Sequence, residues 1–310
     1  MALAIGVAAP PAQALETIET GLIGSPQAGG WPYYIALEKG FFADAGVSLD
    51  IVYVPTAAGL VQQLAAGSLD VVNIGIVEPI HAVARGAPVA IIRLTEAVSS
   101  YEIVAKPEIK TIQDLKGHTV VIGGLVDINR IYLERVLKAA GLTDKDIDIT
   151  VVGNTAGRFA ALKSGAADAT MLAPPVNFFA ENAGFHNIGM MIDYTKDLPF
   201  GTTDVSLSFA EQHRDAMMRY LKALDRSIAW FNDDANRGEA VKMMVEASKL
   251  KPDEVEKSYD FFRKGKFFEP TGKVSRQKLG ALIDALVSLG DAQKIEVEKL
   301  VLPGVTQISE

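Results

Sequence analysis

Two arginines are the clearest candidates for binding something small. Arg158 stands in the first turn of a helix predicted over 157–166, where the helix dipole disfavours a cation by ~0.3–1 kcal/mol. An anionic partner would offset that cost, either a ligand carboxylate or sulfonate or a carboxylate of the protein itself. Arg130, in the first turn of a helix predicted over 128–140, allows the same two interpretations.

Three acids, Glu78, Asp127 and Asp204, fall near the ends of predicted strands. Capping and the helix dipole explain an acid at a helix start, which is where Glu78 and Asp127 stand. If these acids line a pocket instead, the ligand must carry a positive or hydrogen-donating group.

Three aromatic residues, Trp31, Tyr33 and Phe178, follow predicted strands closely enough to stack on a planar ligand. Packing in a hydrophobic core is the alternative for each, because aromatics at helical spacing usually belong to a core. The glycines that precede Trp31 favour an exposed, ligand-facing position for that residue.

The sequence carries no common signature of catalysis. It lacks the glycine-rich nucleotide loops, the Gly-x-Ser-x-Gly elbow and the His-Glu-x-x-His zinc motif. It has no cysteine, and its four histidines are scattered without metal-ligand spacing. We therefore predict a protein that is not an enzyme, with no cofactor and no metal.

The elements that would position these residues occur twice. Residues 52–75 and 150–173 align without gaps, and each copy reads as a strand, a loop, an amphipathic helix, a Gly-x-x-Asp turn and a second strand. The aligned pairs are Val54 and Val152, Gly59 and Gly157, Leu64 and Leu162, Gly67 and Gly165, and Asp70 and Asp168. Two copies predict two similar α/β lobes with a cleft between them, whereas a solenoid needs at least three.

Short apolar runs alternate with helical segments over most of the chain, which is typical of a parallel sheet. The predicted strands are 17–23, 49–54, 71–75, 89–94, 119–122, 147–152, 169–172 and 188–192. The predicted helices between them are 31–39, 57–66, 76–85, 128–140, 157–166 and 175–183. After Phe209 helices dominate, with one long helix predicted over 211–233 and another around 279–289.

Two extended segments, 99–106 and 201–207, bracket the second copy and are predicted to cross between the lobes as hinge strands. Lobe 1 would then be discontinuous, comprising 15–98 and 208–310, and lobe 2 would comprise 107–200. Ligands of open parallel sheets lie beyond the carboxyl ends of the strands. The loops at those ends give the predicted ligand-binding residues: Gln27, Trp31, Tyr33, Thr56, Glu78, Gly124, Asp127, Asn154, Thr155, Arg158, Pro174 and Asp204.

Composition limits the kinds of partner and the cellular location that we expect for this protein. The 310-residue chain has a formal charge of −8, and without a basic stripe we expect no nucleic-acid partner. Its longest apolar runs are far shorter than a membrane span. Residues 1–14 are interpreted as a signal-peptide remnant, because an apolar run precedes an Ala-Gln-Ala triplet, and export is expected.

Several motifs resemble one family. The segment 31–47 (WPYYIALEKGFFADAGV), together with 82–89 and 111–120, is similar to periplasmic solute-binding proteins of nitrate, sulfonate and taurine ABC transporters. This group is also called NMT1/THI5-like or SsuA-like. The resemblance implies the type II periplasmic-binding fold, a monomer in the periplasm, and a small-molecule solute delivered to an ABC permease with its ATPase.

The resemblance leaves the ligand open. Members that bind nitrate or sulfonates commonly have small hydroxyl residues where this chain has Leu125 and Val126, followed by Asp127. This favours a larger, partly apolar organic solute, anionic or zwitterionic, such as a sulfonate or an aromatic carboxylate. The alternatives are a protein that binds pyrimidine precursors of thiamin, or a pyrimidine-synthesising enzyme, whose relatives carry a His- and Cys-rich iron site.

Overall fold

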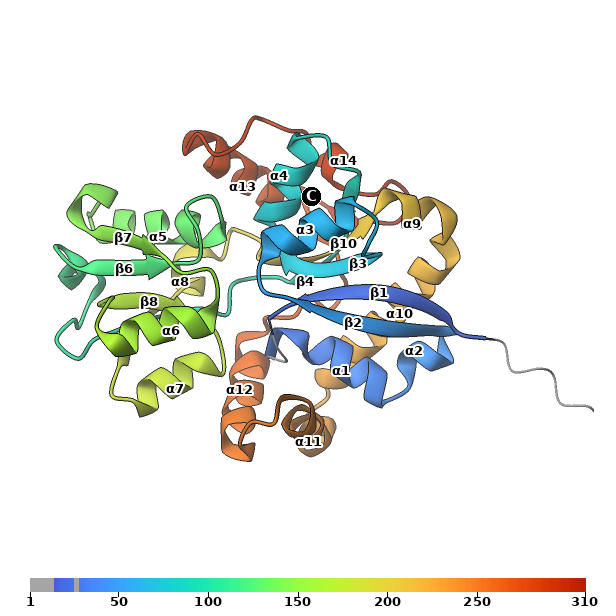
Figure 1. Ribbon diagram of the computed structural model, residues 1–310, viewed down its shortest axis with the longest axis horizontal. Coiled ribbons are helices and arrows are strands. Elements are labelled where there is room, and N and C mark those ends of the chain that lie inside the picture. Colours follow the sequence, from blue (N-terminus) through green and yellow to red (C-terminus); the bar gives the residue numbers. More distant parts are fainter. Residues whose placement is uncertain (1–13, 25–27) are drawn as a thin grey trace, which may run out of the picture.

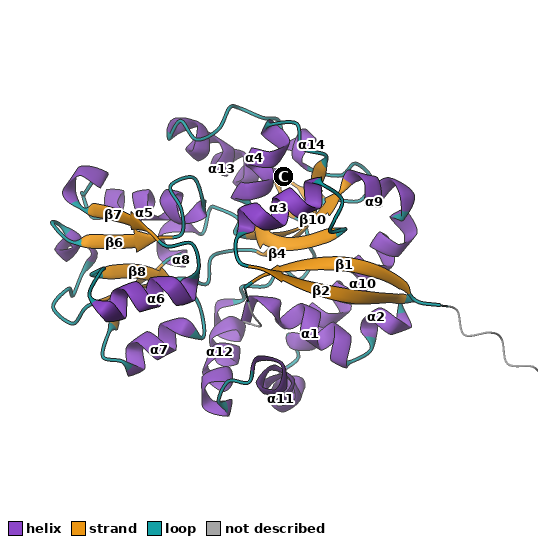
Figure 2. Cartoon of the chain, in the orientation of Figure 1, coloured by secondary structure: helices purple, strands orange, loops and turns teal. Residues whose placement is uncertain are grey.

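Two five-stranded sheets organise the chain into two lobes in the computed structural model, which describes residues 14–24 and 28–310 (Figure 1). The predicted signal-peptide remnant therefore lies outside the described residues, except for Ala14. Helices cover the sheets in both lobes (Figure 2). Within the described ranges, no helix combines the length and the apolar character that crossing a membrane requires.

The sheet of lobe 1 has the strand order β2-β1-β3-β10-β4. Its strands are β1 (Glu16–Ile23), β2 (Val47–Val54), β3 (Val71–Gly75), β4 (Val89–Glu96) and β10 (Gly201–Ser206). The first three strands pair in parallel, whereas β10 runs antiparallel to β3 and β4.

The sheet of lobe 2 repeats this plan in the order β7-β6-β8-β5-β9. Its strands are β5 (Glu102–Ala105), β6 (Thr119–Ile122), β7 (Asp148–Val151), β8 (Ala169–Leu172) and β9 (His186–Met190). Here β5 runs antiparallel to β8 and β9. The sheets are thus mostly parallel, which confirms the predicted parallel-sheet lobes, with β5 and β10 as the antiparallel strands. The antiparallel strands are the ones that arrive from the other lobe, so they enter each sheet from its cleft edge.

Six helices follow strands of the two sheets. They are α1 (Trp31–Glu38), α3 (Ala57–Ala65), α4 (Val77–Ala84), α5 (Ile128–Ala139), α6 (Thr155–Ser164) and α7 (Val176–Asn182). The short helices α2 (Phe41–Asp44) and α8 (Ile192–Thr195) complete the two lobes. The C-terminal part adds α9 (Leu207–Gln212), α10 (Arg214–Phe231), α11 (Arg237–Ser248), α12 (Pro252–Gly265), α13 (Arg276–Ser288) and α14 (Val297–Leu300), with a small sheet of β11 (Val274–Ser275) and β12 (Ile308–Ser309).

The long helix predicted over 211–233 is confirmed as α10, although it begins three residues later than predicted. The chain first forms α9, whose start is capped by the Ser206 hydroxyl, and breaks at His213 before α10 begins. The buried apolar residues that recur every three or four positions from Met217 to Phe231 lie entirely within α10, so they carried no information about the shorter helix that precedes it.

The sequence repeat is reproduced down to individual hydrogen bonds. The Thr56 hydroxyl caps α3 by accepting from the amide of Gly59, and the Asn154 side chain caps α6 by accepting from the amide of Gly157. The two aligned aspartates, Asp70 and Asp168, each accept a backbone amide hydrogen bond of 2.9 Å from a strand of their own lobe, β1 for Asp70 and β6 for Asp168. The prediction that the two copies fold alike is confirmed.

Candidate ligand-binding site

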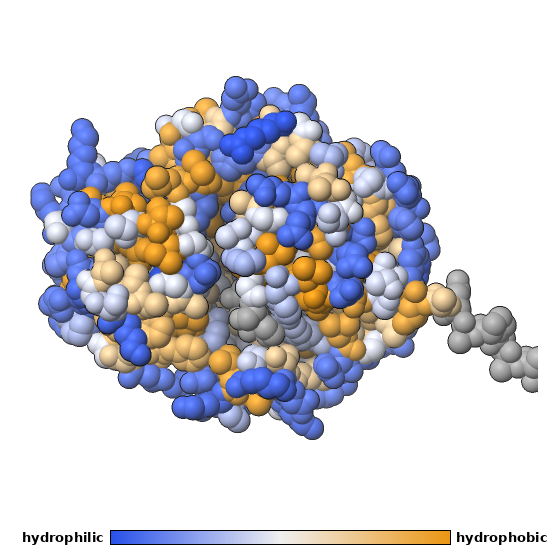
Figure 3. All heavy atoms as spheres, in the orientation of Figure 1, coloured by the Kyte–Doolittle hydropathy of each residue, from blue (hydrophilic) through white to orange (hydrophobic). Residues whose placement is uncertain are grey.

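A cleft of about 1130 Å³ lies between the two lobes, at the carboxyl ends of their parallel strands. Its lining comes from equivalent loops of both copies, including the capping residues Thr56 and Asn154. Figure 3 shows the hollow between the two halves, with apolar side chains gathered on the lobe 2 side of it. The volume exceeds what a small ligand alone requires, as an open form of a closing cleft would.

Most of the predicted binding residues line this cleft. They are Thr56, Glu78, Gly124, Asp127, Asn154, Thr155, Arg158 and Pro174. Gln27 lies outside the described residues. Trp31, Tyr33 and Asp204 are held elsewhere, and their positions correct the prediction.

Trp31 belongs to the core of lobe 1. It is 1% exposed, and its ring centroid lies 5.7 Å from those of Phe231 and Phe262 and 6.2 Å from that of Tyr259. These partners come from α10 and α12, which the local sequence around Trp31 could not indicate. The residue is an aromatic core anchor and does not reach the cleft.

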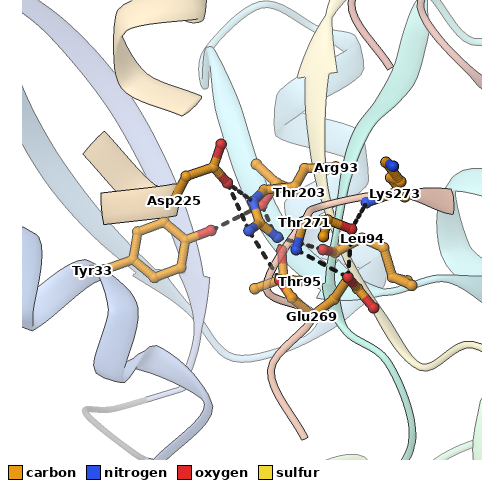
Figure 4. A network of polar contacts seen from close by, with 9 residues as sticks. All are labelled: Tyr33, Arg93, Leu94, Thr95, Thr203, Asp225, Glu269, Thr271 and Lys273. Atoms are coloured by element: carbon orange, nitrogen blue, oxygen red, sulfur yellow. Dashed lines mark hydrogen bonds and ion pairs between the residues drawn. The ribbon is translucent and has the colours of Figure 1, made fainter. Parts of the chain in front are cut away.

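Tyr33 of α1 is also buried, and it contacts the sheet of lobe 1. Its hydroxyl lies 3.2 Å from the hydroxyl of Thr203, which lies 2.8 Å from that of Thr95. Figure 4 shows this group beside the buried Arg93, which bonds Asp225 of α10. Tyr33 thus helps to join α1 to β10 and β4 and is not available to a ligand.

Asp204 lies in β10 and is fully buried within lobe 1. Its Oδ2 accepts a hydrogen bond of 2.8 Å from the Thr202 hydroxyl. Burial raises the pKa of Asp204 well above its ordinary value, against that hydrogen bond, and the nearby Glu78 raises it further. Asp204 therefore stands behind the cleft wall rather than in it.

Phe178, predicted as a stacking residue, instead packs across the lobe boundary on Phe261 of α12, with ring centroids 5.9 Å apart. Its neighbour Phe179 lines the cleft, together with Tyr34, Tyr53, Tyr101 and Phe200, which the sequence did not single out. The hydroxyls of Tyr34 and Tyr53 lie 2.9 Å apart. The cleft therefore offers aromatic surface, although not from the predicted residues.

Arg158 is buried in the lobe 2 wall, with 1% exposure. Its Nε donates to the carbonyl of Met171 at 3.1 Å, and its terminal nitrogens donate to the carbonyl of Gly153 and the hydroxyl of Thr155. The guanidinium carbon lies 5.6 Å from the centre of the Tyr101 ring. Among the described residues no carboxylate forms an ion pair with Arg158, although its charge acts on Asp127.

Arg130 is paired within the protein. Both of its terminal nitrogens bond the carboxylate of Asp144 on the outside of lobe 2. Of the two interpretations allowed by the sequence, the structure supports pairing with a protein carboxylate for Arg130.

Asp127 combines two roles. Its Oδ1 accepts the amides of Asn129 and Arg130 at the start of α5, at 2.9 and 3.3 Å, so the capping interpretation is confirmed. Its carboxylate also lines the cleft. Burial raises the pKa of Asp127, against the opposing effects of Arg158 and of these hydrogen bonds.

Glu78 lines the opposite wall, at the start of α4, where no side chain caps the helix. Its Oε2 is buried and has no hydrogen-bond partner among the described residues. Burial and the facing Asp127 raise the pKa of Glu78 to about 8. The position of Glu78 in the first turn of α4 and the hydrogen bond from its own amide agree with the capping and dipole interpretation, and the residue also lines the ligand space.

Glu96 is a cleft residue that the sequence analysis missed. It ends β4, just before the chain crosses to lobe 2, and is 7% exposed. Burial raises its pKa to about 8. An acid at the end of the apolar strand 89–94, next to a predicted hinge, is the signal that could have identified it.

These positions define what the site can do. Aromatic rings and a few polar groups that converge in a cleft are suited to holding a planar or partly apolar organic molecule. Within the described parts of the chain, no group of three or more acids or histidines is arranged to hold a metal ion.

Several proteins of known sequence or structure are similar to this chain. The chain is 22% identical over 270 residues to the putative binding protein YtlA of Bacillus subtilis, covering 85% of this chain and 80% of YtlA. It is 29% identical over 163 residues to a formylaminopyrimidine-binding protein of Halalkalibacterium halodurans, covering 51% of this chain and 48% of that protein.

Among solved structures, the periplasmic aliphatic sulphonate binding protein SsuA of Escherichia coli superimposes with a TM-score of 0.76. The two are 19% identical, and the match covers 95% of this chain and 94% of SsuA. At this identity the likeness shows that the two proteins share the periplasmic-binding fold. Residues 28–237 match the family described as NMT1/THI5 like, and the chain belongs to that family.

Proposed function

We propose that this protein is the solute-binding component of an ABC importer, and that it captures a small organic solute by closing its two lobes. The observation that carries the proposal is a single cleft lined by equivalent loops of two repeated halves. Within the described ranges, only the segments between β4 and β5 and between β9 and β10 cross between the sheets, which permits closure with few backbone changes.

The proposed partners follow from that role. A closed form would present a surface to a membrane permease that the open form does not have. We place the protein in the periplasm as a monomer, with the permease and its ATPase in the inner membrane. The relatives that are named as binding proteins support this assignment.

Two classes of solute are candidates for the ligand of such a binding protein. The buried guanidinium of Arg158 in the cleft wall favours an anionic or zwitterionic solute such as a sulfonate or an aromatic carboxylate. The cleft acids Glu78 and Glu96 and the formylaminopyrimidine-binding relative favour an aminopyrimidine. Turnover is the less supported alternative, since the chain has no cysteine and no catalytic motif.

A ligand screen by thermal shift tests the proposal. Alkanesulfonates, aromatic carboxylates and aminopyrimidines are compared at equal concentration, and one class is expected to raise the melting temperature by several degrees. Calorimetry should give one site per chain, and mass spectrometry should recover the ligand unchanged. Chemical conversion of the ligand would contradict the proposal in favour of an enzyme.

A matched pair of variants locates the binding. Ala58→Trp puts a large side chain into the cleft at the start of α3, whereas Ala66→Trp puts the same side chain on the exposed C-terminal end of that helix, away from the cleft. The first is expected to abolish the shift and the second to preserve it. Equal behaviour of the two variants, or no shift with any ligand class, counts against the cleft as the binding site.

A further inference from the structure

Glu96 is a largely buried cleft residue whose carboxyl receives no hydrogen bond from the described residues. It is 7% exposed and lines the cleft, and no side-chain hydrogen bond satisfies it among the described residues. A buried polar group without a partner costs stability, so its presence in a cleft points to a partner that arrives with the ligand.

Two glycines keep this carboxyl open to the cleft. A side-chain carbon on residue 29 would lie 3.0 Å from Glu96 Oε1, and one on residue 201 would lie 3.3 Å from Glu96 Cβ. Gly29 and Gly201 both line the cleft themselves. The absence of side chains at these two positions leaves space beside the Glu96 carboxyl for a ligand group.

A second acceptor stands on the same lobe. Glu78 Oε2 is buried without a hydrogen-bond partner among the described residues, as noted above, and it faces Asp127 of lobe 2 across the cleft. Lobe 1 thus presents two carboxyls, from β4 and α4, for which its own side chains supply no donor.

Neither arginine of the cleft lining compensates these acids. Arg85 is an exposed residue at the C-terminal end of α4, and its charge does not act on the carboxyls of Glu78 and Glu96. Arg158 belongs to lobe 2 and donates to three protein acceptors, and the acid on which its charge acts is Asp127 of the same lobe, whose pKa burial nevertheless raises. What remains unmatched is acceptor capacity on lobe 1, and a ligand with hydrogen-donating groups would satisfy it.

We propose that Glu96, supported by Glu78, accepts hydrogen bonds from nitrogen donors of the solute, so that the cleft selects amidine-like or amino-heteroaromatic molecules over anions. This assignment rests on the proposed solute-binding function. A cationic amidine would pair with the ionised carboxylate. A neutral aminopyrimidine would pair with the protonated carboxyl, which accepts from the amino group and donates to a ring nitrogen.

Isosteric probes test the assignment directly. Calorimetry compares benzamidine with benzoate and benzenesulfonate, and 4-amino-2-methylpyrimidine with its 4-methoxy analogue, which has no N–H donor. Because a hydrogen bond to a charged group contributes about 1.5–3 kcal/mol, we expect benzamidine to bind roughly 10- to 100-fold more tightly than benzoate or benzenesulfonate. A neutral hydrogen bond contributes about 0.5–1.5 kcal/mol, so we expect the aminopyrimidine to bind roughly 2- to 10-fold more tightly than its methoxy analogue.

Two variants distinguish a specific role of Glu96 in ligand binding from the general effect of removing a buried acid. Glu96→Gln should weaken benzamidine binding at least tenfold, with no comparable loss for benzoate. The matched control is Glu102→Gln, since Glu102 is 5% exposed and bonds Asn177 at 2.9 Å but does not line the cleft. The control should bind benzamidine within about twofold of the unmodified protein.

A melting curve shows whether the Glu96→Gln variant is folded. The pKa of Glu96 is raised to about 8, so its contribution to stability is present at low pH and lost as the pH rises through that value. The ligand-free variant should therefore melt several degrees above the unmodified protein at pH 9 and close to it at pH 5.

Two results overturn the assignment. One is tighter binding of benzoate or benzenesulfonate than of benzamidine, which would leave the solute-binding function intact. The other is unchanged benzamidine affinity in the folded Glu96→Gln variant. If none of the probes binds at millimolar concentration, the assignment fails, whereas the solute-binding function is contradicted only if the thermal-shift screen also finds no ligand.

Discussion

The two lobes share one supersecondary plan but place opposite kinds of side chain at one internal position. In α3 of lobe 1 that position holds Leu60, which is 0% exposed within an apolar cluster formed with Val54, Leu64 and Val72. In α6 of lobe 2 it holds Arg158, which is 1% exposed and bonded to protein acceptors. The same backbone therefore supports a buried apolar side chain at this position in one lobe and a buried charged side chain in the other.

The acids of the cleft differ between the lobes in the same way. Asp127 of lobe 2 caps a helix and lies near a cation, whereas among the described residues no cation acts on Glu78 or Glu96 of lobe 1. The comparison shows that the repeat specifies the scaffold, while the polarity of each wall is set position by position. Exchanging residues between the lobes tests that separation.

The largest effect is expected for Leu60→Arg, which gives lobe 1 the residue of lobe 2. The apolar cluster around Leu60 has no acceptor arranged for a guanidinium, so the buried charge should cost about 4 kcal/mol or more. Urea denaturation measures the loss, with Leu60→Met as a control that should cost less than about 1.5 kcal/mol. A Leu60→Arg midpoint equal to that of the unmodified protein would show that lobe 1 accommodates the charge as lobe 2 does.

The reciprocal change, Arg158→Leu, should cost about 2–4 kcal/mol. It removes the donor to the Met171 carbonyl and the cation beside Asp127 while roughly filling the space. Arg158→Lys keeps the charge but loses the planar guanidinium with its several donors. Its stability should therefore lie between those of the unmodified protein and of Arg158→Leu. The midpoint of urea unfolding is the measurement, and a Leu variant as stable as the parent would mean that the arginine serves only the ligand.

A smaller effect on stability is expected from replacing the two aligned aspartates, Asp70 and Asp168, and it should differ between them. Although burial opposes it, hydrogen bonds from Lys106, the Thr119 amide and His118 hold the pKa of Asp168 below its ordinary value. Burial raises the pKa of Asp70, against the hydrogen bond from the Glu19 amide. At pH 7 we therefore expect Asp168→Asn to cost about 1 kcal/mol and Asp70→Asn to cost less.

The pH dependence of these two variants should also be opposite. A carboxyl with a lowered pKa contributes stability above its ordinary value, and this contribution is lost as the pH falls. A carboxyl with a raised pKa contributes stability at low pH that is lost as the pH rises. Urea midpoints from pH 7 down to pH 2 should show the cost of Asp168→Asn shrinking and that of Asp70→Asn growing. Parallel curves would contradict this difference between the lobes.

The smallest effect on stability is expected at the equivalent helix caps, where the two lobes are alike. Thr56→Ala and Asn154→Ala each remove one capping hydrogen bond at an exposed helix start, and each should cost about 1 kcal/mol. Thermal melting of the two single variants should agree within about 0.5 kcal/mol. A near-zero effect in only one lobe would show that the two loops are not energetically equivalent.

The sequence predicted the elements of both sheets well, because buried strands and amphipathic helices leave local periodic patterns. It could not predict that β5 and β10 run antiparallel, since strand pairing is decided by contacts distant along the chain. The site shows the same limit. In the segment 31–34 the sequence could not tell which aromatic faces the cleft, because the partners of Trp31 lie in α10 and α12.

The insertion of one sheet within the other imposes an order on folding during synthesis. All strands of the second sheet lie between residues 102 and 190, so this unit is complete while the ribosome is still adding downstream sequence. The first sheet must wait for β10, and the burial of Trp31 must wait for residues as late as Phe262. A nascent chain interrupted before that point would carry a finished inner unit on an unfinished outer one.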